Sequence, residues 1–298
     1  MKKGFCAVAV LGTLAASGLA VAGGMGSSES KGNVFIGLGG SYNSVALANQ
    51  KLYGKGVSQT FDRDGIHIDD GSAAGYSVPF NNDKNKLAPQ VQTGYFKHFM
   101  DSALFWGGKF SYQYLDVTFS NDNMTIAQSG GFINTSTTEN LPSSPFTGNY
   151  VVQSVQTSVN HDLLLLAFVG NSFKQSDIYL GVGPSVFGMQ NKIYNLTGYA
   201  DLEGVTTNIS GAPANFSKTM WVWGGAAQLG AAYHISPTWV FDFNYTYAIT
   251  ARDTVKYSAP FTNVTEVGNT QIGTSFIHSA QHIVVQSVMF SVNKVFSC

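Results

Sequence analysis

The segment WVFDFNYTYAITAR, residues 239–252, decides the fold of this chain. Every second side chain from Trp239 to Ile249 is aromatic or aliphatic, while the residues between them, such as Thr246, are mostly polar. Side chains of a β-strand point alternately to opposite faces. The segment therefore predicts a strand with one apolar face and one mostly polar face.

The composition separates the chain from ordinary soluble domains. Of its 298 residues, 44% are hydrophobic and only 11% are charged, whereas an average soluble domain has roughly 25% charged residues. No apolar run is long enough for a membrane-spanning helix. The net charge of −1 argues against nucleic acid as a partner.

The N-terminal residues 1–22 have the three parts of a secretory signal peptide. Lys2 and Lys3 form the positive region, residues 7–16 are apolar, and Ala20-Val21-Ala22 forms the cleavage signal. We expect the mature chain to begin with a short Gly/Ser-rich leader, residues 23–32, followed by a single domain, residues 33–298. Cys298 would then be the only remaining thiol.

The alternating pattern of residues 239–252 recurs along the chain, which predicts eight strands in total. Long polar connections alternate strictly with short links, so antiparallel strands would place all long loops at one end. An even number of strands of this length, joined in this way, is typical of an up-and-down transmembrane β-barrel with short periplasmic turns and four long extracellular loops. The predicted strands are residues 33–43, 87–99, 104–119, 151–169, 177–189, 219–234, 239–252 and 279–296, and the predicted long loops are residues 44–86, 120–150, 190–218 and 253–278.

A soluble eight-stranded barrel of the lipocalin type is the main alternative fold. Its apolar face would point inward, and its outer face would need many charged residues. Here the polar face is mostly uncharged, which favours the membrane barrel.

The signal peptide, the eight alternating strands and the aromatic Phe296 near the C-terminus together resemble small outer-membrane barrels of the OmpA/OmpX type. The resemblance covers residues 33–296 and implies an outer-membrane location in a Gram-negative bacterium, with both termini in the periplasm. It also implies contacts with outer-membrane lipids and lipopolysaccharide. Two features depart from the family: Ser297 and Cys298 follow the final aromatic, and Lys294 has lipid-facing parity.

Two groups of residues are candidates for sites within such a barrel. Aromatic residues near the strand ends predict the girdles that lie at the membrane interfaces: Trp106, Trp221, Trp223, Trp239, Phe241 and Phe296. Polar residues with inward parity predict the lining of the lumen: Lys109, Gln113, Gln156, Asp162, Asp242, Asn244 and Arg252. An ion pair such as Lys109 with Asp242 would join strands, and the alternative interpretation is the charged lining of a narrow ion path.

Enzymatic and metal sites are weakly supported. His278 and Ser279 are adjacent on a strand and point to opposite faces, so they do not form a His/Ser catalytic pair. The acidic stretch around His67 lacks the ligand spacing of an EF-hand. His161 has lipid-facing parity unless a bulge turns it. We expect no catalytic residues, no metal and no cofactor.

These observations predict a structural or surface-interaction protein, adhesin-like, whose extracellular loops contact a host or environmental ligand. The alternative is a narrow porin-like channel for small or hydrophobic solutes.

Overall fold

A computed structural model describes residues 32–135, 144–202 and 204–297, and these residues form one antiparallel sheet of eleven strands. The signal peptide, most of the leader and Cys298 lie outside the described residues. No helix capable of crossing a membrane occurs in the described part of the chain. The strands are β1 (Asn33–Phe61), β2 (His67–Ser77), β3 (Phe80–His98), β4 (Leu104–Asn134), β5 (Ser144–Phe173), β6 (Ser176–Leu202), β7 (Val205–Asn208), β8 (Ala214–Ser236), β9 (Trp239–Thr250), β10 (Asp253–Val264) and β11 (Thr270–Ser297).

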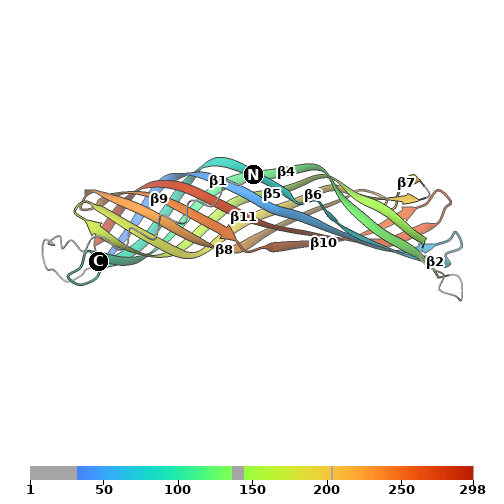
Figure 1. The fold of residues 1–298 in the computed structure, drawn as a ribbon, viewed down its shortest axis with the longest axis horizontal. Coiled ribbons are helices and arrows are strands. Elements are labelled where there is room, and N and C mark those ends of the chain that lie inside the picture. Colours follow the sequence, from blue (N-terminus) through green and yellow to red (C-terminus); the bar gives the residue numbers. More distant parts are fainter. Residues whose placement is uncertain (1–31, 136–143, 203, 298) are drawn as a thin grey trace.

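The strands wind obliquely around one long axis (Figure 1). Their pairings lead from β1 through β3, β4, β5, β6, β8, β9 and β11 and back to β1. Short turns at residues 99–103, 174–175 and 237–238 lie at the end that we call proximal. The opposite, distal end carries β2, β7 and the turns at residues 62–66 and 265–269.

The expected long loops are mostly β-strand, which corrects the sequence prediction. The strands β1, β4 and β5 have 29, 31 and 30 residues, so they continue well into residues 44–86 and 120–150. Residues 190–218 and 253–278 likewise contribute to β6, β8, β10 and β11. Apart from β7 and residues 209–213, only short turns remain at the distal end among the described residues.

The alternation is lost in these segments because the strands contain irregularities that change parity. Asn49 and Asn123 have positive φ angles of 51° and 56°, and the register of β1 shifts between Ala48 and Lys51. In β1, the odd-numbered residues from Ser41 to Leu47 are buried, and even-numbered residues such as Leu52 are buried after the shift. A bulge inserts one extra residue, so the inward-pointing residues are odd-numbered before it and even-numbered after it. A single period-2 pattern therefore cannot describe the whole strand.

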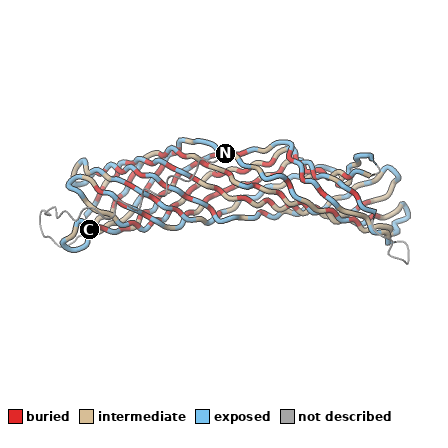
Figure 2. Tube along the Cα trace, in the orientation of Figure 1, coloured by how far each residue is buried: buried red, intermediate tan, exposed pale blue. Residues whose placement is uncertain are grey.

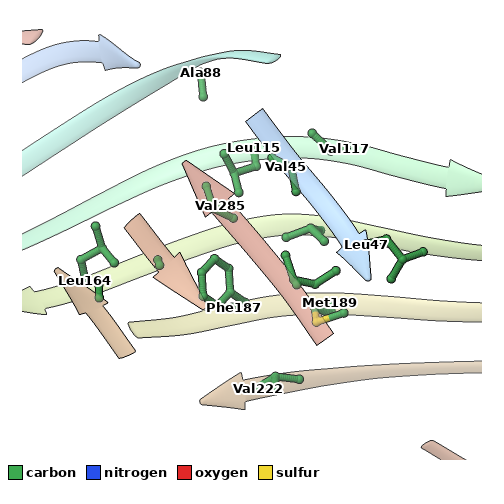
Figure 3. Close-up of a cluster of buried hydrophobic side chains, with 14 of the residues drawn as sticks. Val45, Leu47, Ala88, Leu115, Val117, Leu164, Phe187, Met189, Val222 and Val285 are labelled. Atoms are coloured by element: carbon green, nitrogen blue, oxygen red, sulfur yellow. The ribbon is translucent and has the colours of Figure 1, made fainter. Parts of the chain in front are cut away.

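The interior is filled in layers from the proximal to the distal end. Buried residues recur along every long strand, and the side chains of the central cluster meet across the molecule (Figures 2 and 3). An aromatic cluster around Phe105 closes the proximal end, and a polar layer follows it. Beyond that layer lie the central apolar cluster around Phe187, a second polar layer around Gln281, and two distal apolar clusters around Ile126 and Phe146.

The outer surface changes character along the same axis. On the proximal half, large apolar side chains are exposed on all eight strands of the circuit: Leu38, Val91, Phe110, Leu165, Leu180, Leu229, Phe243 and Phe290. Further along β4, the exposed side chains are polar, namely Thr118, Ser120, Asp122 and Thr125. The proximal half is therefore apolar outside with polar layers inside, whereas the distal half is mostly polar outside and largely apolar inside.

Candidate functional site

The proximal polar layer is built around a buried ion pair. Lys109 on β4 and Asp242 on β9 lie 3.4 Å apart between Nζ and Oδ2, and both side chains are almost fully buried. Tyr179 on β6 connects them, since Lys109 donates to its hydroxyl at 2.9 Å and the hydroxyl donates to Asp242 Oδ1 at 2.8 Å. The ion pair that the sequence suggested is thus present, with a tyrosine that the sequence analysis did not identify.

Amide side chains complete the coordination of the Asp242 carboxylate. Gln92 and Asn244 donate to Oδ2 at 3.2 and 3.1 Å. Gln92 also donates to Ser291 and Asn293 on β11, at 2.8 and 2.7 Å. The layer therefore links β3, β4, β6, β9 and β11, and the pairing and hydrogen bonds compensate for the cost of burying the two charges.

A glycine provides the space for Tyr179. A Cβ atom added at Gly230 on β8 would lie 2.2 Å from Cζ of the Tyr179 ring. The side chain of Tyr179 has inward parity, like Asp177 two residues before it. That parity was the available sequence signal, but a tyrosine with a polar hydroxyl fits either face of a barrel strand.

Gln113 and Asp162 form a second buried polar pair. Gln113 Nε2 donates to Asp162 Oδ2, and Gln113 Oε1 accepts a hydrogen bond from Ser41 at 2.7 Å. Asp162 Oδ1 has no hydrogen-bond partner among the described residues. Five of the seven predicted lumen residues are therefore buried: Lys109, Gln113, Asp162, Asp242 and Asn244.

The remaining two predicted lumen residues do not point into the interior, which corrects the expectation. Gln156 is partly exposed between the buried residues Val155 and Thr157. A register shift between Val159 and His161 reverses the parity of this part of β5. Arg252 is exposed at the break between β9 and β10.

The six predicted girdle residues are all exposed, with relative exposures between 38% for Phe241 and 65% for Trp223. Lys294, which has outward parity, places its ammonium 4.9 Å from the centre of the Trp239 ring and donates to Thr238 Oγ1 at 3.0 Å. The lysine is therefore partnered at the proximal edge of the apolar surface rather than isolated on it.

His161 is partly exposed within an aromatic group at the distal edge of the apolar surface. Its Nδ1 lies 3.0 Å from the Tyr112 hydroxyl, and its ring stacks against Trp221 at 5.6 Å. The bulge beside His161 places this ring among its aromatic neighbours, and no sequence spacing indicated the contact.

The residues considered for catalysis and metal binding lie as follows. Ser279 is fully buried, whereas the ring of His278 is 5.6 Å from that of Tyr53 on the neighbouring strand. His67 Nε2 lies 3.1 Å from Asp70 Oδ1 at the distal end. Within the described ranges, no group of three or more His, Cys, Asp or Glu side chains is arranged to hold a metal ion.

No protein-family model and no curated protein matches this chain. Solved structures that it resembles include the outer membrane protein OprG from Pseudomonas aeruginosa, with a TM-score of 0.32 and 11% identity, covering 91% of this chain and 99% of that one. Another is Ail, the attachment invasion locus protein of Yersinia pestis, with a TM-score of 0.29, 12% identity and coverages of 87% and 99%. Neisserial surface protein A has a TM-score of 0.21, 13% identity and coverages of 80% and 97%. These resemblances are too distant to indicate what the chain binds.

Proposed function

We propose that the chain is an eight-stranded outer-membrane β-barrel that projects far beyond the membrane and serves as a rigid surface-interaction protein. In this interpretation β2 with β3, and β9 with β10, are single barrel strands interrupted at residues 78–79 and 251–252, and β7 belongs to a distal excursion. The eleven strands then reduce to the eight of the circuit.

The pairing register supports closure. Starting at Ser44, paired residues lead through Gln286, Tyr247, Ala227, Val182, Ala167, Gly108 and Tyr95 to Val34. One passage around the sheet thus returns to β1 ten residues from its start, since 44 minus 34 is 10. A fixed stagger of this kind is what a closed barrel of tilted strands requires.

The apolar outer surface supports insertion of only the proximal half into a membrane. A tilted strand crosses a bilayer in about 9–11 residues, whereas β5 has 30. More than half of such a strand therefore extends beyond the hydrocarbon, on the side opposite the proximal turns. We infer that this distal part is extracellular and that the proximal turns and both termini are periplasmic.

The observation that carries the proposal is the reversal of polarity along the strands. The proximal half is apolar outside with polar layers inside, and the distal half is mostly polar outside and largely apolar inside. A distal half with an apolar interior cluster that includes Leu52, Ile126, Val152 and Ile277, all at most 1% exposed, has the core of a water-soluble barrel. Such a core makes the extension rigid without support from lipid. A rigid extension positions its tip at a fixed distance from the membrane, which suits contact with an external partner better than solute conduction.

The tip carries an acidic surface suited to such a contact. Asp62 and Asp64 lie in the β1–β2 turn, Asp69 and Asp70 lie at the start of β2, and Glu266 lies in the β10–β11 turn. Arg63 Nε donates to Val267 O at 2.9 Å and joins the two turns. We infer an adhesin-like role for this surface, without catalysis, toward an extracellular or host ligand with complementary positive charge.

The proposal is tested by removing the tip charges while preserving the barrel. The quadruple variant D62N/D64N/D69N/D70N on the bacterial surface should reduce attachment to host cells to the level of cells lacking the protein. The control variant D116N/D122N removes charges from the side of the extension and should attach normally. Equal attachment by both variants and the parent protein, at equal surface amounts of folded barrel, would contradict the adhesin-like role.

A further inference from the structure

The wall of the distal half has an opening between β8 and β10. Pairing of β8 with β9 ends at Gly224 and Thr250. Beyond this point, residues 214–223 of β8 pair with β6, and β10 pairs with β11, while β8 and β10 are not paired with each other. Two strand edges therefore face one another across a seam.

A few contacts span the seam at separate levels. At its base, Ala251 N donates to Trp223 O at 2.8 Å. Higher up, the rings of Phe216 and Tyr257 lie 5.3 Å apart. At its top, Asn263 Nδ2 donates to Asn208 O at 3.0 Å. Between the aromatic pair and this top contact, the wall remains hollow.

A cavity of about 260 Å³ occupies that hollow. Pro213, next to β8, and Pro260, on β10, both line it, and Leu196 and Phe261 contribute further apolar surface. A single water needs a cavity of only about 10–15 Å³, so this cavity has room for a small organic molecule. Three hydroxyl groups, from Ser210, Thr262 and Ser275, are its polar side-chain groups, and no charged side chain lines it.

Features of the edges argue against insertion of a partner's β-strand. Pro260 cannot donate a backbone hydrogen bond, and a proline within a strand is typical of edges protected from pairing. The loop at residues 209–213 also packs on β10, because a Cβ at Gly211 would lie 2.4 Å from the Thr262 carbonyl oxygen. A compact ligand fits this hollow better than an extended peptide.

A second cavity of about 20 Å³ adjoins the first and shares Ser210 and Phe261 with it. Its size suits one water molecule. Gln128 lines it and is only 7% exposed. Its Nε2 has no hydrogen-bond partner among the described residues. Tyr150 lines it as well and bonds to Ser275 at 3.0 Å, so a polar chain continues behind the larger cavity. Burial raises the pKa of the Tyr150 hydroxyl, which therefore stays neutral.

We propose that the larger cavity binds one neutral sugar ring. Such a ring offers apolar C–H faces for Leu196, Pro213 and Phe261 and hydroxyl groups for Ser210, Thr262 and Ser275. The lining provides no cation to compensate a buried carboxylate or phosphate, so charged sugars are excluded. This site is independent of the acidic tip and of the partner that the tip contacts.

Saturation-transfer NMR on the full-length mature barrel, in micelles of a sugar-free detergent, tests the proposal. Methyl β-D-glucoside is the probe, and methyl β-D-glucuronide is its charged counterpart. We expect saturation transfer to the glucoside and none to the glucuronide. Equal signals from the two, or no signal from the glucoside, would overturn the assignment.

Two pairs of variants locate the binding site. Ala259→Leu fills the cavity and should weaken glucoside binding at least tenfold, whereas Ala127→Leu, exposed on β4, should leave it unchanged. Thr262→Val removes a rim hydroxyl and should weaken binding severalfold, whereas Thr254→Val on the same strand should not. If A259L folds, as judged by its gel mobility before and after heating, and still binds like the parent, the sugar does not occupy this cavity.

Discussion

Lys109 and Asp242 are 133 positions apart in the sequence, yet their side chains meet at 3.4 Å in the interior of the proximal half. The contact joins β4 to β9 across the molecule, and the Tyr179 hydroxyl bonds to both residues. Because each charge is buried and satisfied by the other, the two form one unit whose members cannot be removed independently.

Removing one member of this ion pair should be strongly destabilising. Lys109→Met leaves the Asp242 carboxylate buried without its cation, and we expect a loss of about 3–5 kcal/mol in the free energy of unfolding. Urea unfolding in micelles, followed by tryptophan fluorescence, measures this change. The double variant K109M/D242N should recover a substantial part of the loss, and a double variant whose loss equals the sum of the single losses would contradict the coupling.

Gly230 should be required for the same layer. Gly230→Ala places a methyl group 2.2 Å from the Tyr179 ring, so the ring must move and weaken its bonds to Lys109 and Asp242. We expect destabilisation of about 1–3 kcal/mol, as for other overpacked interiors. Gly225→Ala is the matched control on β8, because its added Cβ has no atom within 4 Å. Indistinguishable urea midpoints for the two variants would show that Tyr179 adapts without cost.

The bulge at Asn49 should depend on a residue that tolerates a left-handed backbone. Asn49 has a φ of 51°, and a β-branched residue is strained there by about 1–2 kcal/mol. Asn49→Val should therefore lower stability, and Asn49→Gly should be close to neutral. Deleting Asn49 should remove the bulge without turning Lys51 or Lys55 inward, because Leu47, Gln50 and Leu52 would then alternate without interruption on the inner face. Limited proteolysis of the refolded variants measures these outcomes: an Asn49→Val variant as resistant as the parent and the Asn49→Gly variant would exclude strain at this position.

The proximal half was predictable from sequence because one pattern governs it. In β9, the twelve residues from Trp239 to Thr250 alternate between exposed and buried without interruption, and the exposed side chains are large and apolar, whereas those on the buried face are mostly small or polar. All eight predicted strands begin within strands of the structure. The buried residues Lys109 and Asp242 could be identified by the same parity.

The distal half was not predictable because its outer face is polar and its parity changes. Residues 120–134 of β4 present Ser, Asn, Thr and Gln at a frequency typical of loops, and the buried residues Met124 and Ile126 are out of phase with Phe119. Positive-φ residues such as Asn123 cause that phase change, but asparagine is equally common in turns. Gln156 was assigned to the wrong face for the same reason, since the shift at His161 has no distinct sequence signature.

The layered interior predicts an absence of steady ion conduction. Phe105 and Phe168 belong to the proximal aromatic cluster, and fully buried residues such as Phe187 fill the central layer. In planar lipid bilayers bathed in about 1 M KCl, the folded parent protein should give no discrete current steps. Reproducible steps that change with Asp242→Asn would instead favour a narrow channel through the proximal polar layer.

The reversal of surface polarity along the strands is tested most directly by spin labels on the outward face of β4. The labels are attached to single-cysteine variants of a C298S protein, which is reconstituted into lipid bilayers. Nitroxides at Phe110, Tyr114, Thr118 and Asp122 report collision with oxygen, which partitions into lipid, and with a water-soluble nickel complex. We predict dominant oxygen collisions at Phe110 and Tyr114 and dominant nickel collisions at Thr118 and Asp122, because the outer surface becomes polar between Tyr114 and Thr118. Dominant oxygen collisions at all four positions would place the distal half in the membrane and contradict the proposed extracellular extension.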